Sequence, residues 1–386
     1  MKNIFSLIAV GFIIYIFTFY VDGEMGIIII AFLLAAPIFS IAFALYGKNR
    51  IHISVDCDSY VKKGSYLEVA VIVEKEGIFP LPIVEIKPLA SEVFNQNNKI
   101  YRLSLLSEKK SEFKFKLMAE IGGNGEVSIA SVHSCGFLGF IKFKITQELP
   151  PPKSIGVIPE IPEITSSSNL FRTIADAVLT SEDDEENDTA MLFSANTSPG
   201  YEHREYVQGD SLRRINWKLS SKVSKVMVRL DEAASAVQPC FVLDLYRNSN
   251  CNIIDSLKKE EKLLQSVFGL ITLLIKQGIA SSFIYRDYKG NVISENIDSF
   301  EYPAQLLIKI LTIKVKSDSR ISVNSLSNSM CACIIAATDT TGDFCEIVNL
   351  LPDKEKTCAI VPDNKNVKRI QVPIWYLTDD NNFELV

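Results

Sequence analysis

The sequence predicts a multidomain chain: a two-helix membrane hairpin, an antiparallel β-sandwich and a C-terminal α/β domain whose parallel sheet is covered by helices. Three observations support this fold class. Residues 1–50 hold two long apolar runs, residues 51–149 alternate apolar and polar side chains, and residues 238–386 alternate strand-like and helix-like patterns. Residues 150–200 are predicted as a linker, and residues 201–237 as a segment that joins the two larger domains.

Composition limits the class of protein. The chain has 386 residues, a formal net charge of −6 and eight cysteines. A chain of this length can bury the cores of two or three domains. Its acidic balance argues against general binding to nucleic acid, because a polyanion selects for basic domains. No CxxC pair occurs, so the cysteines are predicted to be buried free thiols in a reducing compartment rather than disulfides or a zinc site.

The two N-terminal runs, Ile4–Tyr20 and Gly26–Tyr46, are separated by the polar break Val21–Glu24. Each run approaches the roughly 20 apolar residues with which a helix crosses a bilayer. A cleaved signal peptide is the alternative for the first run, but no small-x-small cleavage site precedes the break. Lys2 precedes the pair and Lys48 follows it. The positive-inside rule therefore predicts a two-pass protein of the cell membrane with cytoplasmic domains.

The second domain contains short strand-like runs. Period-two alternation is clear in Tyr66–Val73 and Glu112–Leu117, and Gly122–Gly125 is one of the breaks between runs. Such a pattern predicts an antiparallel sandwich. Three consecutive prolines then stiffen the chain, and a short helix is expected at Leu170–Leu179. The acidic block Glu182–Asp188 is predicted as a solvated linker; the alternative is that it folds back on the basic segment that follows.

Residues 201–237 carry a local cluster of Lys and Arg in an otherwise acidic chain. Gly209 and Asp210 are predicted to turn into a helix that begins at Ser211. Asp210 would cap the free N–H groups of the first turn, where its charge is favourable. On this helix Trp217 lies beside the apolar face and can stack on a neighbouring arginine.

Two uses compete for Arg213 and Arg214 in this segment. Guanidinium groups bind phosphate or carboxylate groups of a partner through paired hydrogen bonds. Alternatively, they pair internally with Glu205 and Asp210 and lock the segment in place. The capping pattern and apolar spacing favour the structural lock.

The same segment carries a dense motif. Its residues reproduce the pattern R-E-Y-x-x-G-D-x-L-R-x-I-x-W-K: Arg204, Glu205, Tyr206, Gly209, Asp210, Leu212, Arg213, Ile215, Trp217 and Lys218. In this motif, and in its layout, the chain resembles the bacterial domain of unknown function (DUF) 58 family. The resemblance implies a membrane hairpin, a β domain, the motif and a von Willebrand factor A-like domain. It also implies association with a MoxR-type AAA+ ATPase, which suggests a docking partner.

The C-terminal domain alternates strands and helices, and that order indicates a parallel sheet covered on both faces. The charged residues 258–261 are expected to face water. Strands are predicted at Cys240–Leu243, Ser281–Tyr285, Cys331–Ala336, Cys358–Val361 and Val372–Leu377, and helices at Ser256–Gln277, Ala304–Ile313 and Phe344–Leu351.

Asp244 and Asp339 each follow a predicted strand, at the sheet edge where ligands bind. Von Willebrand factor A-like domains can hold Mg²⁺ there through a D-x-S-x-S loop, a threonine and a further aspartate. The resemblance thus implies Asp244, Asn248 and Asp339 as metal residues. Tyr246 and Asn248 replace the two serines, no threonine is assignable, and Arg247 adds positive charge. Loss of metal binding is therefore expected.

Catalytic patterns are weak in this sequence. The three histidines show neither triad nor metal spacing, and neither a Walker loop nor GxGxxG occurs. Cys331 and Cys333 would lie on one face of a strand, where core thiols are favoured over a redox pair. A cytoplasmic adaptor that is not an enzyme is the leading hypothesis, a Mg²⁺-dependent ligand-binding module is the second, and an unrecognised enzymatic activity is the third.

Overall fold

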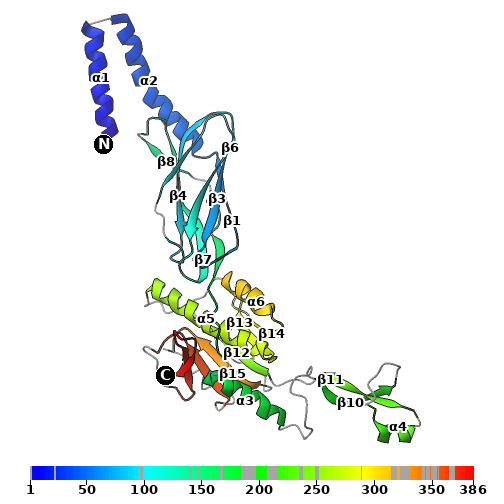
Figure 1. The fold of residues 1–386 in the computed structure, drawn as a ribbon. Coiled ribbons are helices and arrows are strands. Elements are labelled where there is room, and N and C mark those ends of the chain that lie inside the picture. The colour runs from blue at the N-terminus through cyan, green and yellow to red at the C-terminus, as the bar shows by residue number, and fades with distance from the viewer. Residues whose placement is uncertain are drawn as a thin grey trace. The chain divides into compact units, whose positions relative to one another are not determined.

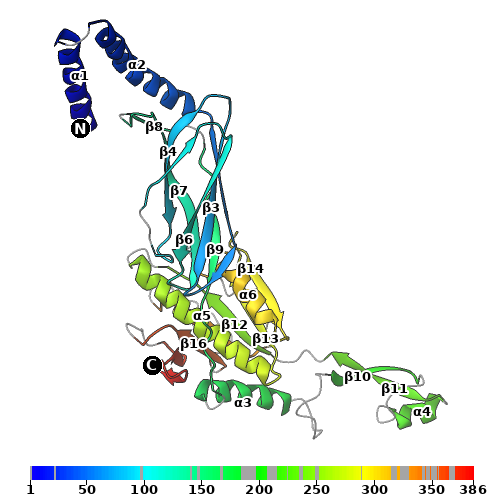
Figure 2. The ribbon, with the colours of Figure 1, turned by 45° about the horizontal axis from the view of Figure 1, so that its top comes forward.

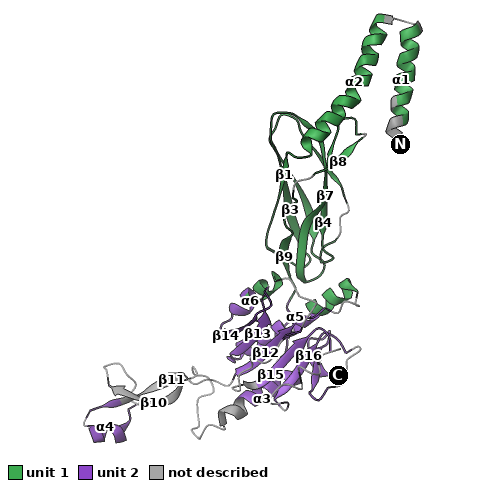
Figure 3. Ribbon diagram, turned by 180° about the vertical axis from the view of Figure 1, so that it is seen from behind, with its two compact units in different colours: residues 1–160, 250–261, 306–315 green, residues 161–249, 262–305, 316–386 purple. Residues whose placement is uncertain are grey.

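The structure, a computed structural model, divides into two compact units (Figure 3). Unit 1 contains residues 1–160, 250–261 and 306–315, and unit 2 contains residues 161–249, 262–305 and 316–386. The structure describes residues 2–20, 23–95, 99–139, 141–145, 148–165, 168–183, 197–206, 215–223, 225–233, 238–247, 252–287, 289–313, 320–321, 330–340, 344, 348, 354, 356–364 and 370–386.

Unit 1 begins with two helices (Figure 1). The helices α1 (Lys2–Tyr20) and α2 (Gly23–Gly47) coincide with the two predicted apolar runs. Within the described ranges, α2 alone is long and apolar enough to cross a membrane, over Glu24–Gly47, and the apolar part of α1, Ile8–Phe19, is shorter. One N-terminal helix therefore has the length and composition of a membrane span.

Two sheets form the β domain of unit 1. One sheet has the order β1-β3-β6, and the other has the order β2-β9-β7-β4-β5 with β8 paired to β7. Neighbouring strands are antiparallel except β2 and β9. Buried apolar side chains of both sheets share one core, as the predicted sandwich requires. The strands are β1 (Ile51–Cys57), β2 (Tyr60–Lys62), β3 (Tyr66–Lys75), β4 (Leu81–Ala90), β5 (Tyr101–Leu105), β6 (Lys110–Met118), β7 (Gly123–Cys135), β8 (Lys142–Lys144) and β9 (Lys153–Ile158).

Alternation explains most of these strands. In β3, Leu67 and Val69 are buried while Glu68 between them is exposed, as one face of a sheet packs on a core. The exception is β9, which lies beyond the predicted boundary of this domain and inside the predicted linker. Its buried residues Ile155 and Val157 complete the larger sheet. The prolines on both sides of this short strand hide its two-residue period.

Unit 2 is built on a seven-stranded sheet of order β14-β13-β12-β15-β16-β17-β18 (Figure 2). The inner strands pair in parallel, as predicted, whereas β14 and β18 add antiparallel edges that the sequence analysis missed. The strands are β12 (Gln238–Asp244), β13 (Ser281–Arg286), β14 (Val292–Ile297), β15 (Met330–Ala337), β16 (Thr357–Val361), β17 (Ile374–Leu377) and β18 (Phe383–Leu385).

Two predicted helices are formed close to their expected ranges, as α5 (Ile253–Lys276) and α6 (Tyr302–Leu311). The expectation that residues 258–261 face water is wrong for Glu260 and Glu261, which are buried. Within unit 1, Glu261 Oε1 accepts a hydrogen bond from Lys63 Nζ at 2.7 Å. Burial of a carboxylate is unfavourable unless it is paired and hydrogen-bonded, and Lys63 is the partner here.

The predicted linker and the joining segment after it also contain helices and strands. A longer helix, α3 (Asn169–Asp183), replaces the short one expected there, and only the first two residues of the acidic block are described, at its end. The strands β10 (Thr197–Glu205) and β11 (Met227–Ala233) pair antiparallel, and α4 (Trp217–Val223) lies between them in sequence. The helix predicted at Phe344–Leu351 lies outside the described residues, apart from two positions.

Candidate functional site

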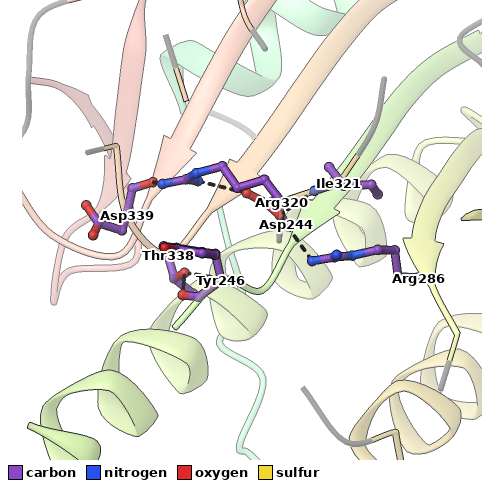
Figure 4. Close-up of polar contacts among 7 residues, drawn as sticks. All are labelled: Asp244, Tyr246, Arg286, Arg320, Ile321, Thr338 and Asp339. Carbon is purple, nitrogen blue, oxygen red and sulfur yellow. Dashed lines mark hydrogen bonds and ion pairs between the residues drawn. The ribbon is translucent and has the colours of Figure 1, made fainter. Parts of the chain in front are cut away.

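Polar side chains gather at the carboxyl ends of β12 and β15 in unit 2 (Figure 4). The chain passes from β12 through α5 to β13 on one side, whereas β15 pairs on the other side, so the strand order reverses here. Ligand sites of open α/β sheets lie at such a reversal. We call this cluster the Asp244 centre; it comprises Asp244, Tyr246, Arg286, Arg320, Ile321, Thr338 and Asp339.

Asp244 ends β12, and its side chain is 1% exposed. Oδ2 accepts a hydrogen bond from Arg320 Nη1 at 2.8 Å, and Oδ1 accepts one from the backbone N–H of Ile321 at 3.1 Å. Arg286, the last residue of β13, places Nη2 at 3.8 Å from Oδ1. Both carboxylate oxygens therefore face nitrogen donors of the same chain.

Arg320 is held on several sides, and its side chain is 6% exposed. Its Nη2 donates to the backbone oxygen of Asp339 at 2.9 Å. The guanidinium carbon lies 4.4 Å from the ring centroid of Tyr246 and 5.4 Å from that of Phe344. A guanidinium group suits this position because its edge donates hydrogen bonds while its face stacks on aromatic rings.

A second set of bonds joins the loops that follow β12 and β15. The N–H of Tyr246 donates to Thr338 Oγ1 at 3.1 Å, and that hydroxyl donates to the backbone oxygen of Tyr246. The N–H of Thr338 also donates to the backbone oxygen of Asp244 at 3.4 Å. These bonds fix the two strand ends against each other around the buried carboxylate.

Burial raises the pKa of the Asp244 carboxyl above its ordinary value, and the positive charges of Arg320 and Arg286 with one backbone N–H oppose that rise. Mg²⁺ requires near-octahedral oxygen ligands. Here the Asp244 oxygens contact nitrogen donors, and the backbone oxygen of Asp339 accepts a hydrogen bond from Arg320. The described donors therefore do not fit Mg²⁺.

The third residue of the predicted metal set stays a prediction. Asn248 lies outside the described residues. Over the part of the chain that the structure describes, no group of three His, Cys, Asp or Glu side chains is placed to hold a metal ion.

Both aspartates were predicted at this edge, whereas Arg286, Arg320 and Thr338 were not. Arg286 directly follows a predicted strand, and Thr338 directly precedes Asp339. The position at a strand end was therefore a usable signal for these two residues. Arg320 follows a polar stretch without helical or strand periodicity, and no sequence pattern pointed to its pairing with Asp244.

The motif segment differs from its prediction in where the helix begins. Ile215 and Asn216 are not helical and α4 begins at Trp217, so a helix that runs on from Ser211 through these two residues is wrong. Residues 211–214 lie outside the described part of the chain. Asn216 caps α4: its Oδ1 accepts a hydrogen bond from the Leu219 N–H at 3.1 Å. The N–H of Asn216 donates to the backbone oxygen of Met227 at 2.9 Å, which holds this residue beside β11.

One side of α4 is fixed and the other is exposed. Ser220 Oγ donates to the backbone oxygen of Asn216 at 2.8 Å and accepts from the Met227 N–H at 2.9 Å. Trp217, by contrast, is 67% exposed. We call the exposed residues on α4 and just after it the α4 surface; it comprises Trp217, Lys218, Lys222, Val223 and Val226.

The other motif residues divide into two groups. Arg204 and Glu205 lie in β10, opposite β11, and the N–H of Tyr206 donates to the backbone oxygen of Val226 at 2.8 Å. The other group lies outside the described part of the chain: Gly209, Asp210, Leu212, Arg213 and Arg214. The choice between structural lock and partner binding therefore stays a prediction for Arg213 and Arg214.

The described cysteines are free thiols, and most are buried. Burial raises the pKa of Cys358 to about 12 and also raises the pKa of Cys333. Such thiols are protonated at neutral pH and are poor nucleophiles. The predicted pair of Cys331 and Cys333 is described only in part, because the Cys331 side chain lies outside the described residues.

Comparisons with known proteins give only distant likenesses. No protein-family model matches the chain, and no curated protein matches it. A cohesin module from Clostridium perfringens is 17% identical over 29% of this chain and 99% of that chain, with a TM-score of 0.24. A CARDB domain from Pyrococcus furiosus is 11% identical over 30% and 97%, with a TM-score of 0.23. Native alpha-2-macroglobulin from Escherichia coli is 14% identical over 30% and 18%, with a TM-score of 0.25.

Proposed function

We propose that this chain is a membrane-anchored adaptor that docks a protein partner through the α4 surface. One observation carries the proposal: Trp217 is 67% exposed on α4, with the exposed lysines Lys218 and Lys222 on the same short helix. Tryptophan is strongly enriched among the residues that dominate binding energies at protein interfaces. An exposed tryptophan framed by charge therefore marks an interaction site.

The composition of the α4 surface defines the kind of partner. Val223, at the end of α4, and Val226, just after it, are 49% and 43% exposed, so this surface offers apolar side chains besides Trp217. The two lysines favour a partner with carboxylates around an apolar pocket. Opposite charges at the rim speed up association and fix the orientation of the partner.

The contacts of the Asp244 centre favour a structural role for this centre over a catalytic one. Its carboxylate accepts hydrogen bonds from Arg320 and Ile321, and its two guanidinium side chains are only 6% and 14% exposed. Charges that are paired within the chain leave little for a substrate to bind. We infer that this centre holds the ends of β12 and β15 in place.

The resemblance to the DUF 58 family supplies the class of partner. Trp217 and Lys218 belong to the matching motif and lie on the α4 surface. A MoxR-type AAA+ ATPase is therefore the proposed partner. The reversal of strand order beside Asp244 supports the proposed von Willebrand factor A-like assignment of the C-terminal domain.

The membrane topology is part of the same proposal. The helix α2 would cross the bilayer, and α1 would cross it in the opposite direction. Lys48 and Arg50 follow α2 directly, which supports cytoplasmic placement of the β domain and of the C-terminal domain.

Replacing Trp217 with alanine tests the docking surface. The full chain is captured from detergent-solubilised membranes, with an anchor-only chain as background, and the recovered ATPase is then titrated in purified form. We expect enrichment of a MoxR-type ATPase by the wild type. The Kd should rise about 30-fold or more in W217A, because truncating such a residue costs about 2–4 kcal/mol.

Phe300→Ala is the matched control, since Phe300 is 68% exposed and lies outside the α4 surface. Both variants should unfold at the wild-type temperature. Equal ATPase binding by wild type and W217A would remove the α4 surface as the docking site. If no ATPase is enriched above the anchor-only background, the proposal of an ATPase adaptor is wrong.

The alternative is a Mg²⁺-dependent ligand-binding module that uses Asp244 and Asp339. The donors around Asp244 oppose it, so we expect no heat when the purified chain is titrated calorimetrically with Mg²⁺ or Mn²⁺. Binding heat that disappears in Asp244→Asn would restore this alternative, because that change removes the carboxylate and keeps the side-chain shape.

A further inference from the structure

Two loops of the β domain expose apolar side chains beside the end of α2. Ile78 and Phe79, between β3 and β4, are 93% and 57% exposed, and Phe137 and Ile141, between β7 and β8, are 44% and 38% exposed. Figures 1 and 3 both show β8 next to the end of α2. We call these four residues the collar.

The loop after β7 is attached to α2 itself. Ser40 is 4% exposed, and its Oγ accepts a hydrogen bond from the Leu138 N–H at 3.3 Å. A side chain at Gly136 would collide with Ser40 Oγ and with its backbone, so only glycine allows this close approach. The Gly139 N–H donates to the Gly136 oxygen at 2.9 Å and closes the turn that carries Phe137.

The loop after β3 is attached a little farther along the chain. The rings of Phe79 and Tyr46 meet edge-on with centroids 5.1 Å apart. Arg50 Nη1 donates to the Tyr46 hydroxyl at 2.9 Å, and the Glu76 N–H donates to the Arg50 oxygen at 2.9 Å. Gly77 has a φ of 101°, and a side chain there would meet the Tyr46 hydroxyl.

These attachment points define the depth of each loop. The candidate span begins at Glu24, and roughly 20 residues cross the hydrocarbon core, so α2 would leave that core near Phe43. Ser40 then lies within one turn of the boundary. Tyr46 lies about 9 Å farther along the helix axis, at a rise of about 1.5 Å per residue. The loop after β7 thus lies at the acyl boundary, and the loop after β3 lies in the headgroup layer.

We propose that the collar lies in the interface of the bilayer that α2 crosses, so that the β domain rests on lipid directly. The inference depends on the proposed membrane anchoring by α2. Phe137 and Ile141 would contact acyl chains, and Phe79 would lie among headgroups, where aromatic side chains are favoured. The basic Lys48 and Arg50 would face lipid phosphate, which adds electrostatic attraction in an anionic leaflet.

The test places a fluorescent reporter in the collar of the full chain. Phe137→Trp and Tyr66→Trp variants are reconstituted into phosphatidylcholine–phosphatidylglycerol vesicles whose lipids are brominated near the top of the acyl chains. The wild-type signal is subtracted. We expect bromine to quench most of the fluorescence that F137W adds and to leave that of Y66W unchanged. Tyr66 is 66% exposed and begins β3, about 30 Å from the collar at roughly 3.3 Å per residue.

Flotation of the same vesicles separates the two levels of the proposal. A chain that floats while F137W is no more quenched than Y66W overturns the collar, keeps the anchor and leaves these apolar side chains to a protein partner. A chain that does not float overturns both. Equal strong quenching of both variants also overturns the collar, because the whole domain would then lie on the membrane. Should F137W fail to fold, Ile141→Trp carries the same test, with most of its added fluorescence quenched if the collar is correct, because Ile141 is assigned to the same depth as Phe137.

Discussion

The Asp244 centre and the α4 surface hold their charges in opposite ways. In the Asp244 centre the carboxylate is 1% exposed and Arg320 is 6% exposed, and their atoms meet at 2.8 Å. On the α4 surface the lysines are exposed together with Trp217, which is 67% exposed. The first region has satisfied its charges within the chain, while the second presents charge and apolar area to the solvent.

This difference separates residues that stabilise the fold from residues that can act outside it. Removing one member of a buried ion pair leaves a charge in a medium of low polarity, which destabilises the folded state. Removing an exposed side chain changes stability little but changes what the surface can bind. Each of the following substitutions either sharpens this distinction or breaks it.

The largest effect is expected for Arg320→Ala. The change leaves the Asp244 carboxylate buried without its closest cation and removes the stacking on Tyr246. We expect a loss of about 3–5 kcal/mol in the free energy of unfolding. Urea unfolding of the detergent-solubilised chain measures it, with the fluorescence of Trp375, which is 7% exposed in unit 2, as the signal.

The control removes both charges, in Asp244→Asn with Arg320→Ala, and should recover a substantial part of the lost stability. The effect of R320A also depends on pH. The pKa of Asp244 is already raised in the folded state, and the loss of Arg320 raises it further. The penalty of R320A should therefore shrink as the pH falls and be smallest below the unfolded-state pKa of about 3.9, where the carboxyl is protonated in both states. A penalty that is small and independent of pH would contradict a buried charge pair.

Only the two aspartates of this centre were predicted from the sequence. The alternation of strands and helices placed Asp244 and Asp339 at the carboxyl edge of the sheet, because parallel strands bring their ends together. The pattern did not identify Arg320, since a pairing across 76 positions depends on tertiary packing and leaves no local period. The resemblance suggested a metal site at Asp244, where the guanidinium group of Arg320 binds the carboxylate instead.

An intermediate effect is expected for Glu85→Gln in the β domain. Glu85 is 6% exposed, but its partners Arg102 and Lys142 are 67% and 45% exposed. In exposure, this cluster is therefore intermediate between the Asp244 centre and the α4 surface. Burial acts to raise the pKa of Glu85, but the hydrogen bonds and charges of both partners outweigh it and lower the pKa. At neutral pH we expect a loss of about 1–3 kcal/mol.

The folded state shifts the pKa of Glu85 in the opposite direction to that of Asp244, yet the cost of E85Q should also depend on pH. Because the pKa of Glu85 is lower in the folded state, its stabilising contribution is present above about pH 4.3 and is lost as the pH falls through the folded value. The cost of E85Q should therefore fade in acid. Glu74→Gln is the control: its partner Lys110 lies 3.1 Å away, but both side chains are more than half exposed and little change is expected. Equal costs for both variants would show that burial is not the deciding factor.

Long elements of the fold were predicted better than short ones. Long strands with clear alternation, such as β3, were predicted because one face is buried along the strand, and α5 was predicted from the helical spacing of its apolar residues. Short elements were missed or shifted. The strand β9 lies between prolines, and α4 begins only at Trp217 because Asn216 bonds to β11 as well as capping the helix.

The smallest effect is expected for Lys222→Glu on the α4 surface. Lys222 is exposed at the end of α4, so the free energy of unfolding should stay within about 0.5 kcal/mol of the wild type. Affinity for the ATPase should fall by about 2- to 5-fold, as for a charge at the rim of an interface, and much less than in W217A. Titrations at low and high salt measure this change, which should fade as salt screens the charges.

Lys258→Glu matches this change in net charge on another exposed helical lysine and should leave ATPase binding unaltered. A loss confined to K222E and to low salt places the positive charge of α4 at the edge of the docked partner. A loss of stability in K222E would instead show that Lys222 is paired within the chain, as Arg320 is. The α4 surface would then join the structural group, and Trp217 alone would remain to bind a partner.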